Sequence, residues 1–451
     1  MVSKTQLAKL GLFDAKVPRY TSYPTAPHFS PNVGPSEFSH WIGTIQPGDQ
    51  ISLYLHVPFC RRLCWFCACR TQGTQSPEPV RAYAETLKQE LALLGQHLPK
   101  GVTLSRLHWG GGTPTLMPAD MMADLAASIF AMAPLAKDAE FSVEIDPNEI
   151  DAARLDALAA AGMNRASIGI QDFDEDIQKT IGRLQGFETT RNAVDMIRAR
   201  GVRSLNADIL FGLPNQTHAR ITDTVQKLLS FNPDRVALYG YAHVPWMAKR
   251  QQMIPSDALP TPEERLALFE TAQRLFVWDG YTEIGIDHFA RPDDSMARAL
   301  KAGTLRRNFQ GYTDDPAQVL IGVGASSISR FQQGYAQNAP ATSAHVAAIR
   351  AGQFSTARGH VFSGQDIMRA RIIEALMCDF RIDAHELKDS FGLSDRQIEA
   401  LLQPVAQAFD GLLHLSPEGL FIPPAARPLA RMVARAFDAY DLSKAGHSSA
   451  I

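Results

Sequence analysis

The stretch SLYLHVPFCRRLCWFCACRT, residues 52–71, joins a β-like run to a cluster of cysteines. The run SLYLHV (52–57) predicts a strand, because it is rich in the residue types that strands favour. Four of the chain's five cysteines follow within ten positions, and the fifth, Cys378, lies more than 300 positions away. A disulfide framework spreads cysteines along a short secreted chain, so this clustering predicts a metal or redox site instead.

The spacing of these cysteines indicates which kind of metal or redox site they form. Cys60, Cys64 and Cys67 follow the pattern C-x3-C-x2-C, and Cys69 comes two residues later. A structural zinc site usually joins two C-x2-C halves across a longer loop. One short loop can instead hold three corners of a cubane iron–sulfur cluster and leave the fourth iron open. The pattern is that of radical S-adenosylmethionine (SAM) enzymes, and a four-cysteine zinc knuckle is the alternative.

Composition excludes several classes of protein. The chain has 451 residues, of which 45% are apolar and 20% charged, so it is an ordinary globular protein of two to four domains. Its formal net charge of −3 argues against a chain-wide attraction to nucleic acid or to an anionic membrane. We find neither a signal peptide nor an apolar stretch of about 18 residues that would span a membrane. We therefore expect a cytoplasmic protein that binds no nucleic acid.

Short β-like runs alternate with helical segments between about residues 50 and 290. Repeated β-α-β order without hairpin signals predicts a parallel sheet, and six such units favour a barrel or partial barrel. We expect an α/β fold, a partial (β/α)6-type barrel with its chemistry at the carboxyl ends of the strands. The predicted strands span 52–57, 103–109, 140–146, 164–170, 203–211 and 234–241.

The expected domains follow from changes in composition. We expect residues 1–48 to cover the site and residues 49–335 to form the barrel with its extension. The stretch GYAQNAPATSAHVAAIRAGQFSTARGHVFSG is rich in Gly, Ala, Ser and Pro, which indicates a connector at residues 336–363. Residues 364–451 predict a mainly helical domain in which a helix, SFGLSDRQIEALL and a hairpin at LLHLSPEGLFI give a winged-helix-like shape. Its helix DRQIEALLQPVAQAF is not basic, so a packing or lid role is preferred to DNA binding.

Polar residues follow several predicted strands. The run WGGGTPT (109–115) lets a ligand approach the backbone closely, and it is not a phosphate-binding Walker loop. One unit after the cysteine loop, it fits the amine and carboxylate of SAM. Glu144 and Asp208 are candidates to hold ribose hydroxyls or the amine, and Gln171 and Arg183 are candidates to orient a carboxylate. Each of these residues alone also fits an ordinary polar group at a strand end.

The motifs taken together resemble the oxygen-independent coproporphyrinogen III oxidases, radical SAM dehydrogenases of haem synthesis. The similarity spans nearly the whole chain, and the order of the motifs makes it specific. The matching blocks are PRYTSYPTA (18–26), YLHVPFCRRLCWFCAC, LHWGGGTPT, EIDP, GIQDF, DILFGLP, YAHVP, DHFARPDD, RNFQGYT and GASSIS.

This resemblance implies a [4Fe–4S] cluster bound by Cys60, Cys64 and Cys67, with Cys69 near the cluster but not a ligand. It also implies two SAM molecules in one site. The first would contact Tyr54, Gly111, Glu144 and Ile328, and the second Phe66, Gly112, Thr113, Gln171, Arg183, Asp208 and Ala242.

The implied reaction converts two propionate side chains of coproporphyrinogen III to vinyl groups, releasing two carbon dioxides and giving protoporphyrinogen IX. Cys69, Tyr54 and His56 are the candidate catalytic residues. The four carboxylates of the substrate require a local cationic pocket, for which the candidates are Arg19, His288, Arg291, Arg306 and Arg307. We expect a monomer that receives electrons from a carrier of the flavodoxin or ferredoxin type.

Two other functions remain open. A haem chaperone of the same superfamily would share the barrel, but it typically has Asp-Phe after the third cysteine and lacks a PRYTSYPT-like start. This chain has Cys69 and residues 18–26 instead. A different radical SAM reaction on a tetrapyrrole, such as methyl transfer, would be distinguished by the mass of the product.

Overall fold

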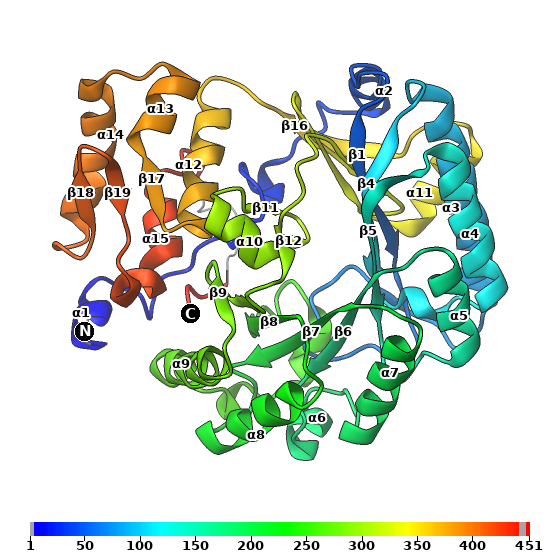
Figure 1. Ribbon diagram of the computed structural model, residues 1–451, viewed down its shortest axis with the longest axis horizontal. Coiled ribbons are helices and arrows are strands. Elements are labelled where there is room, and N and C mark those ends of the chain that lie inside the picture. The colour runs from blue at the N-terminus through cyan, green and yellow to red at the C-terminus, as the bar shows by residue number, and fades with distance from the viewer. Residues whose placement is uncertain (1–3, 442–447) are drawn as a thin grey trace.

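The computed structural model describes residues 4–441 and 448–451. Its main element is a twelve-stranded sheet in the order β16-β15-β14-β13-β1-β4-β5-β6-β7-β8-β10-β9. Six parallel strands at its centre confirm the predicted partial barrel (Figure 1). These strands are β1 (Gln50–Val57), β4 (Thr103–Gly111), β5 (Leu135–Ile145), β6 (Arg165–Gln171), β7 (Ser204–Phe211) and β8 (Arg235–Gly240).

Side-chain alternation along these strands separates a core from a cavity. In β1, Leu53 and Leu55 are buried in the hydrophobic core, whereas Tyr54 and His56 line a cavity on the other face of the sheet. Successive side chains of a strand point to opposite faces, so polar residues at every second position all turn inward. The inward polar residues of the other strands include His108, Ser142, Glu144, Ser167, Asn206, Asp208 and Tyr239.

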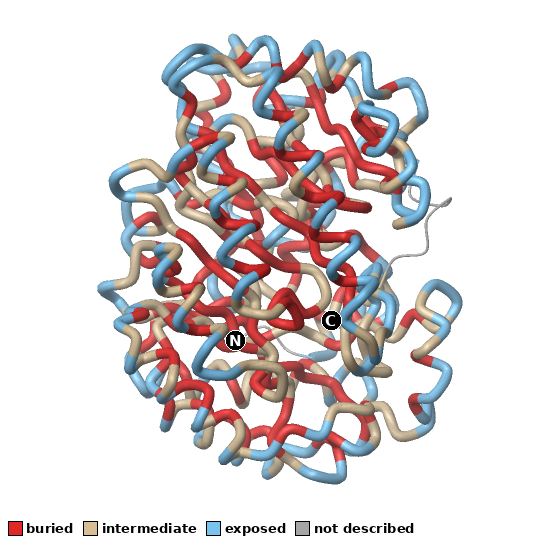
Figure 2. The backbone as a smooth tube through the Cα atoms, turned by 90° about the vertical axis from the view of Figure 1, so that its right-hand side faces the viewer, coloured by how far each residue is buried: buried red, intermediate tan, exposed pale blue. Residues whose placement is uncertain are grey.

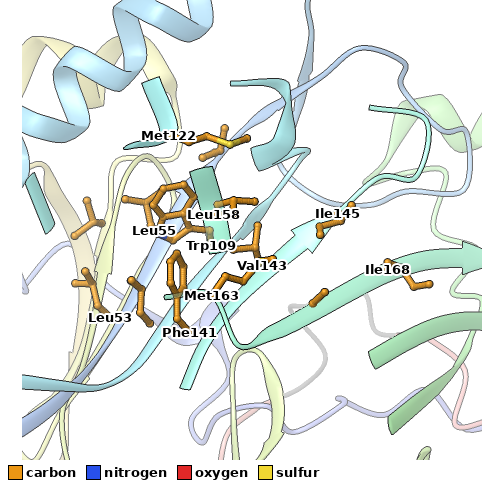
Figure 3. Packing of buried hydrophobic residues seen from close by; sticks show 14 of the residues in the cluster. Leu53, Leu55, Trp109, Met122, Phe141, Val143, Ile145, Leu158, Met163 and Ile168 are labelled. Atoms are coloured by element: carbon orange, nitrogen blue, oxygen red, sulfur yellow. The ribbon is translucent and has the colours of Figure 1, made fainter. Parts of the chain in front are cut away.

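The apolar face of the sheet packs against helices. Trp109 of β4 lies against Phe141 of β5, with ring centroids 5.4 Å apart. Met122 and Leu158 lie over these strands (Figure 3). The crossover helices are α3 (Glu78–His97), α4 (Ala119–Met132), α5 (Ala152–Ala160), α6 (Glu175–Thr180), α7 (Phe187–Ala199) and α8 (His218–Leu229), followed by α9 (Pro262–Trp278). In Figure 2 the buried tube runs through the interior and exposed segments lie outside it, as expected for this layering.

The sheet extends on both sides beyond the six strands of the partial barrel. Next to β8 lie the antiparallel strands β10 (His288–Ala290) and β9 (Thr282–Ile284). Next to β1 lies the parallel strand β13 (Leu320–Val323), followed by the antiparallel β14 (Ile328–Phe331), β15 (Gly334–Asn338) and β16 (Thr356–Val361). A separate hairpin, β11 (Arg306–Asn308) and β12 (Gly311–Thr313), follows helix α10 (Ser295–Ala302).

The expectation of a connector at residues 336–363 is wrong. This range contains the end of β15, helix α11 (Thr342–Arg350) and strand β16, and it forms one side of the sheet. Gly359 is required for strand packing, because a Cβ there would lie 2.0 Å from the carbonyl oxygen of Tyr335. Gly352 instead has a positive φ of +72° in the turn that follows α11.

The C-terminal domain has the predicted winged-helix-like order of helix, strand, two helices and hairpin. Its elements are α12 (Asp366–Cys378), β17 (Arg381–Asp383), α13 (Ala384–Phe391), α14 (Asp395–Ala408), β18 (His414–Ser416), β19 (Gly419–Phe421) and α15 (Ala430–Arg435). Cys378 is fully buried in the interior, as its apolar neighbours predict. Among the described helices, none is both long and apolar enough to cross a membrane.

The N-terminal segment is divided between the two parts of the molecule. Helix α1 (Lys4–Lys9) and the residues up to Tyr23 share a hydrophobic core with the C-terminal domain, and α1 lies beside α15 in Figure 1. Helix α2 (Pro35–Ile42) instead packs Phe38 and Trp41 into the core of the barrel. The segment therefore bridges the barrel and the C-terminal domain.

Candidate functional site

The cysteine loop lies at the carboxyl end of β1. Cys60 ends the short strand β2 (Phe59–Cys60), which pairs with β3 (Gln72–Gly73), so the intervening residues form a closed loop. All five cysteines of the chain are free thiols. Burial raises the pKa of the Cys60 thiol to about 11, although a hydrogen bond with Thr113 opposes the shift, and Cys64 and Cys67 act on it electrostatically. The three predicted ligands therefore lie near one another.

Two observations test whether this loop fits an iron–sulfur cluster. Arg183 donates from Nη1 to Sγ of Cys64 over 3.5 Å. Hydrogen bonds from Cys69, and then the charges of Arg250 and Arg183, lower the pKa of Cys67. Such cations suit a site that gathers several thiolates. In the described part of the chain, no three His, Cys, Asp or Glu side chains converge as a single metal ion would require. The fit thus rests on the donor set of the loop and on its cationic neighbours.

The glycine run lies directly against the cysteine loop. Gly112 and Thr113 donate their backbone N–H groups to the carbonyl oxygens of Val57 and Phe59, each over 2.8 Å. A Cβ on Gly112 would lie 2.5 Å from the carbonyl oxygen of Phe59, so no larger residue fits without a shift. Gly111 has a φ of +113°, a conformation that other residues rarely adopt. The run is therefore required for the approach of β4 to the loop.

A cavity of about 580 Å³ opens beside the cysteine loop. It runs along the inner face of the parallel strands, and its lining includes residues from β1, the cysteine loop, β5, β7, β10 and β14. Of the residues proposed from the sequence, the lining contains Tyr54, His56, Cys69, Glu144, Asp208, His288 and Ile328. These seven residues are separated by up to 274 positions in the sequence and share one cavity.

A hydrogen-bonded network connects β1, β4 and β5 in the cavity wall. The Tyr54 hydroxyl and His56 Nδ1 are 3.0 Å apart, and Tyr54 stacks on His108 with ring centroids 5.7 Å apart. His108 Nε2 lies 3.3 Å from one oxygen of Glu144, and the N–H of Gly111 donates to the other over 3.0 Å. Burial opposes the charge of Glu144, but these partners outweigh it and lower its pKa. Glu144 is therefore a carboxylate that faces the cavity.

The opposite wall of the cavity carries a second set of titratable groups. Burial raises the pKa of Asp208 to about 6, although a hydrogen bond from Asn206, 2.8 Å long, opposes the shift. The Tyr239 hydroxyl lies 3.3 Å from His288 Nε2, and His288 Nδ1 lies 2.7 Å from Asp287. Glu144 and Asp208 thus face one cavity with pKa values shifted in opposite directions.

Arg183 and Gln171 lie near the loop but outside the cavity lining. Arg183 also donates to Gly169 and Gln185, both over 3.0 Å, and lies 3.5 Å from Asp146. Its Nε is buried without a hydrogen-bond partner among the described residues. Gln171 ends β6 with a φ of +70°. A buried guanidinium nitrogen without a partner is costly, so Arg183 is suited to a further acceptor.

Phe66 and Ala242 are brought together by a residue that the sequence did not indicate. The fully buried Gln251 donates from Nε2 to the carbonyl oxygens of Phe66, over 2.7 Å, and of Ala242, over 3.0 Å. It accepts from the N–H of Val244 over 2.6 Å. The segment after β8 is therefore fixed to the cysteine loop.

The structure separates the five candidate substrate residues. Arg19 donates to the carbonyl oxygen of Gly240, at the carboxyl end of β8, over 2.6 Å. Arg307 donates to the carbonyl oxygen of Arg19 over 3.4 Å and stacks on Tyr312, so both lie near His288 at the end of the cavity.

Arg291 lies at the opposite, amino end of β8, where it pairs with Asp279. Arg306 is directed toward Glu374, 3.9 Å away. Neither Arg291 nor Arg306 lines the cavity.

Several lining residues were missed by the sequence analysis. His108 lies two positions before the glycine run, and the period-two alternation of LHWGGG could have indicated that it faces inward. Asn308, Phe309 and Gln310 line the cavity from the turn between β11 and β12. They belong to the block RNFQGYT, but their place in the cavity could not be inferred from it, because the hairpin pairs with no strand of the main sheet.

The comparisons with known proteins define the class. Residues 54–228 match the radical SAM superfamily, a range that holds the cysteine loop, the glycine run and the first five parallel strands except the beginning of β1. A solved structure of coproporphyrinogen III oxidase (HemN) from Escherichia coli, described as a radical SAM enzyme, matches with a TM-score of 0.88 and 34% identity, covering 95% of this chain and 100% of that one. The chain is a radical SAM protein.

Closer relatives define the family. The chain is 67% identical over 451 residues to an oxygen-independent coproporphyrinogen III oxidase of Paracoccus denitrificans, with all of both chains covered. It is 37% identical over 442 residues to one of Synechocystis sp., covering 96% of this chain and 94% of the relative. The chain belongs to the oxygen-independent coproporphyrinogen III oxidase family, and these relatives support the enzyme rather than the haem chaperone.

Proposed function

We propose that this chain converts coproporphyrinogen III to protoporphyrinogen IX without oxygen. Two propionate side chains become vinyl groups, and each loses carbon dioxide, one hydrogen atom and one electron. The observation that carries the proposal is the full-length identity of 67% to an oxygen-independent coproporphyrinogen III oxidase. The polar cavity beside a three-cysteine loop agrees with it.

The proposed cofactors are a [4Fe–4S] cluster and two molecules of SAM. Cys60, Cys64 and Cys67 would hold the cluster as thiolates and leave one iron for the amine and carboxylate of SAM. When bound, these groups supply the 5′-deoxyadenosyl radical that removes hydrogen from the substrate. The protein shields this chemistry, because the cavity lies inside the partial barrel and under the cysteine loop.

Each SAM would have its own contacts. We assign the first to Tyr54, Gly111, Glu144 and Ile328, which surround the cavity beside the loop. We assign the second to Phe66, Gly112, Thr113, Gln171, Arg183, Asp208 and Ala242. The unpartnered Nε of Arg183 and the bridge from Gln251 to Phe66 and Ala242 support this second set.

Cys69, Tyr54 and His56 are the proposed catalytic residues. Burial raises the pKa of the Tyr54 phenol well above its usual value and lowers that of the His56 imidazole. Both side chains are therefore neutral near pH 7, and they hold their protons at Oη of Tyr54 and at one ring nitrogen of His56. Cys69 lines the same cavity and follows the cluster ligands directly.

Arg19, His288 and Arg307 remain substrate candidates, because His288 lines the cavity and the guanidiniums of Arg19 and Arg307 lie beside that part of it. The electron carrier is proposed to be of the flavodoxin or ferredoxin type, and a separate acceptor must take the electron released with each carbon dioxide. A monomer and a cytoplasmic location stay predictions from the sequence.

The test is an anaerobic turnover of the full chain. After reconstitution with iron and sulfide, the chain is incubated with SAM, dithionite, coproporphyrinogen III and a one-electron acceptor. We expect protoporphyrinogen IX, detected as fluorescent protoporphyrin IX after oxidation, together with 5′-deoxyadenosine and carbon dioxide. Stable haem binding with no vinyl product would instead favour the chaperone, and a methylated product would favour a different radical SAM reaction.

A further inference from the structure

One face of the sheet extension carries arginines next to the cavity. Ile328 of β14, Gln337 of β15 and Arg358 of β16 are paired across adjacent antiparallel strands, so their side chains share a face. Ile328 and Gln337 both line the cavity. Arg330 lies two positions after Ile328 on β14 and therefore projects from the same face.

Arg358 is oriented by a contact with the cavity wall. Its Nε donates to Oε1 of Gln337 over 2.7 Å, and Gln337 in turn donates from Nε2 to the carbonyl oxygen of Ser326 over 3.0 Å. Within residues 4–441 and 448–451, no hydrogen-bond partner contacts Nη1 or Nη2 of Arg358. The planar fork of the guanidinium thus has its stem fixed and its two terminal nitrogens available.

Arg70 approaches the same place from the cysteine loop. It lines the cavity and immediately follows Cys69. Burial, and then the like charge of Arg70, lowers the pKa of Arg358, so the two guanidiniums lie within electrostatic range of each other. In the described ranges, neither Arg70 nor Arg330 nor Arg358 forms an ion pair with a carboxylate.

Two carboxylates of helix α12 are already engaged by other partners. Asp366 lies 2.9 Å from Nε2 of His360 and also accepts from Ser363 and Tyr440. Glu374 accepts from Arg371 and from the N–H of Arg307. Two guanidiniums within electrostatic range of each other, with Arg330 on the same face of the sheet, make this edge of the cavity a site for an anion.

We infer that Arg70 and Arg358, with Arg330 beside them, bind the carboxylate of a tetrapyrrole propionate that is retained in the product. This inference rests on the proposed function, because that reaction brings four carboxylates into the cavity and releases only two of them. A carboxylate that departs as neutral carbon dioxide loses its ion pair in the transition state, so tight pairing would slow its loss. Strong arginine pairing therefore suits the propionates that do not react.

The test measures porphyrin binding to the full chain without its cluster. The probes are coproporphyrin III, with four propionates, and deuteroporphyrin IX, which carries only the two that the reaction retains. For Arg70→Gln and Arg358→Gln we expect the Kd of both probes to rise about tenfold or more, since each variant loses a charged hydrogen bond. Arg358→Lys, which keeps the charge without the fork, should give a smaller rise. Arg350→Gln, at the exposed end of α11, is the matched control and should not change Kd.

The outcomes separate the inference from the proposed function. If the wild-type chain makes no vinyl product, the proposed function fails, whatever the porphyrin affinities. If the wild-type chain turns over and folded glutamine variants bind both probes as tightly as it does, the arginine site is wrong. If the glutamine variants bind coproporphyrin III more weakly but bind deuteroporphyrin IX unchanged, the assignment to a retained propionate is wrong.

Discussion

At the scale of single residues, the proposed function gives three thiols of the cysteine loop a different role from the fourth. Cys60, Cys64 and Cys67 have the spacing of cluster ligands, and replacing any one by Ser removes a soft thiolate that iron prefers. We expect each variant to lose nearly all of its bound iron and its visible absorption after anaerobic reconstitution. Cys69→Ser is the matched control, and it should keep iron and colour while losing product formation. Loss of iron in Cys69→Ser would indicate a four-thiolate site.

Asp208 illustrates the cost of a carboxylate held inside the cavity. Its pKa is raised from 3.8 to about 6, so the folded chain binds this proton more tightly than the unfolded chain does. The ionised form therefore lowers stability progressively as the pH rises from about 4 to about 6, and by a constant amount above that. Asp208→Asn should raise the free energy of unfolding by about 1–2 kcal/mol at pH 8 and by less at pH 5. Denaturant unfolding at both pH values checks this, with the exposed Asp195→Asn as control. An equal gain in the free energy of unfolding at pH 5 and pH 8 would contradict this prediction.

At the scale of elements, the approach of β4 to the β1–β2 segment determines the shape of the site. Gly112→Ala would place a methyl group against the backbone oxygen of Phe59, next to Cys60. Because backbone cannot rotate away, we expect a loss of about 1–3 kcal/mol in stability and a lower iron content. Gly186→Ala is the matched control, since nothing lies within 4 Å of its Cβ and its φ is −64°. Equal melting temperatures and iron contents in both variants would show that the close approach has no such effect.

The positions of the strands and helices explain which parts of the fold and site the sequence could predict. The six parallel strands were found within a few residues, because each begins and ends at turn residues and is followed by a helical repeat. The cavity residues Glu144 and Asp208 were found because they lie within those strands, whereas Tyr54 was indicated only by the family resemblance. The place of the β11–β12 turn and of Gln251 was not found, since it depends on packing between distant segments. Residues 336–363 were misread because small residues in paired strands and turns resemble those of a linker.

At the scale of the whole molecule, two hydrophobic cores divide the chain. One contains the barrel with α2, and the other joins the C-terminal domain to residues from Leu7 to Tyr23. Arg431 of α15 strengthens this second unit by donating to the carbonyl oxygens of Val17, Pro18, Ser449 and Ala450. The same N-terminal segment carries Arg19, which donates to the carbonyl oxygen of Gly240, so the segment connects the C-terminal domain to the carboxyl end of β8.

This arrangement predicts that the two ends of the chain unfold together. In hydrogen–deuterium exchange, peptides covering residues 12–23 should lose their protection under the same conditions as peptides from α12 and α15. The protection of β1 should change independently of these peptides. Arg431→Gln leaves several buried carbonyl groups with fewer donors, so it should increase exchange in both ends while β1 is unchanged. Arg396→Gln, exposed on α14, is the control and should change neither. If residues 12–23 instead exchange with β1, the N-terminal segment belongs to the barrel, and the C-terminal domain has no such connection to β8.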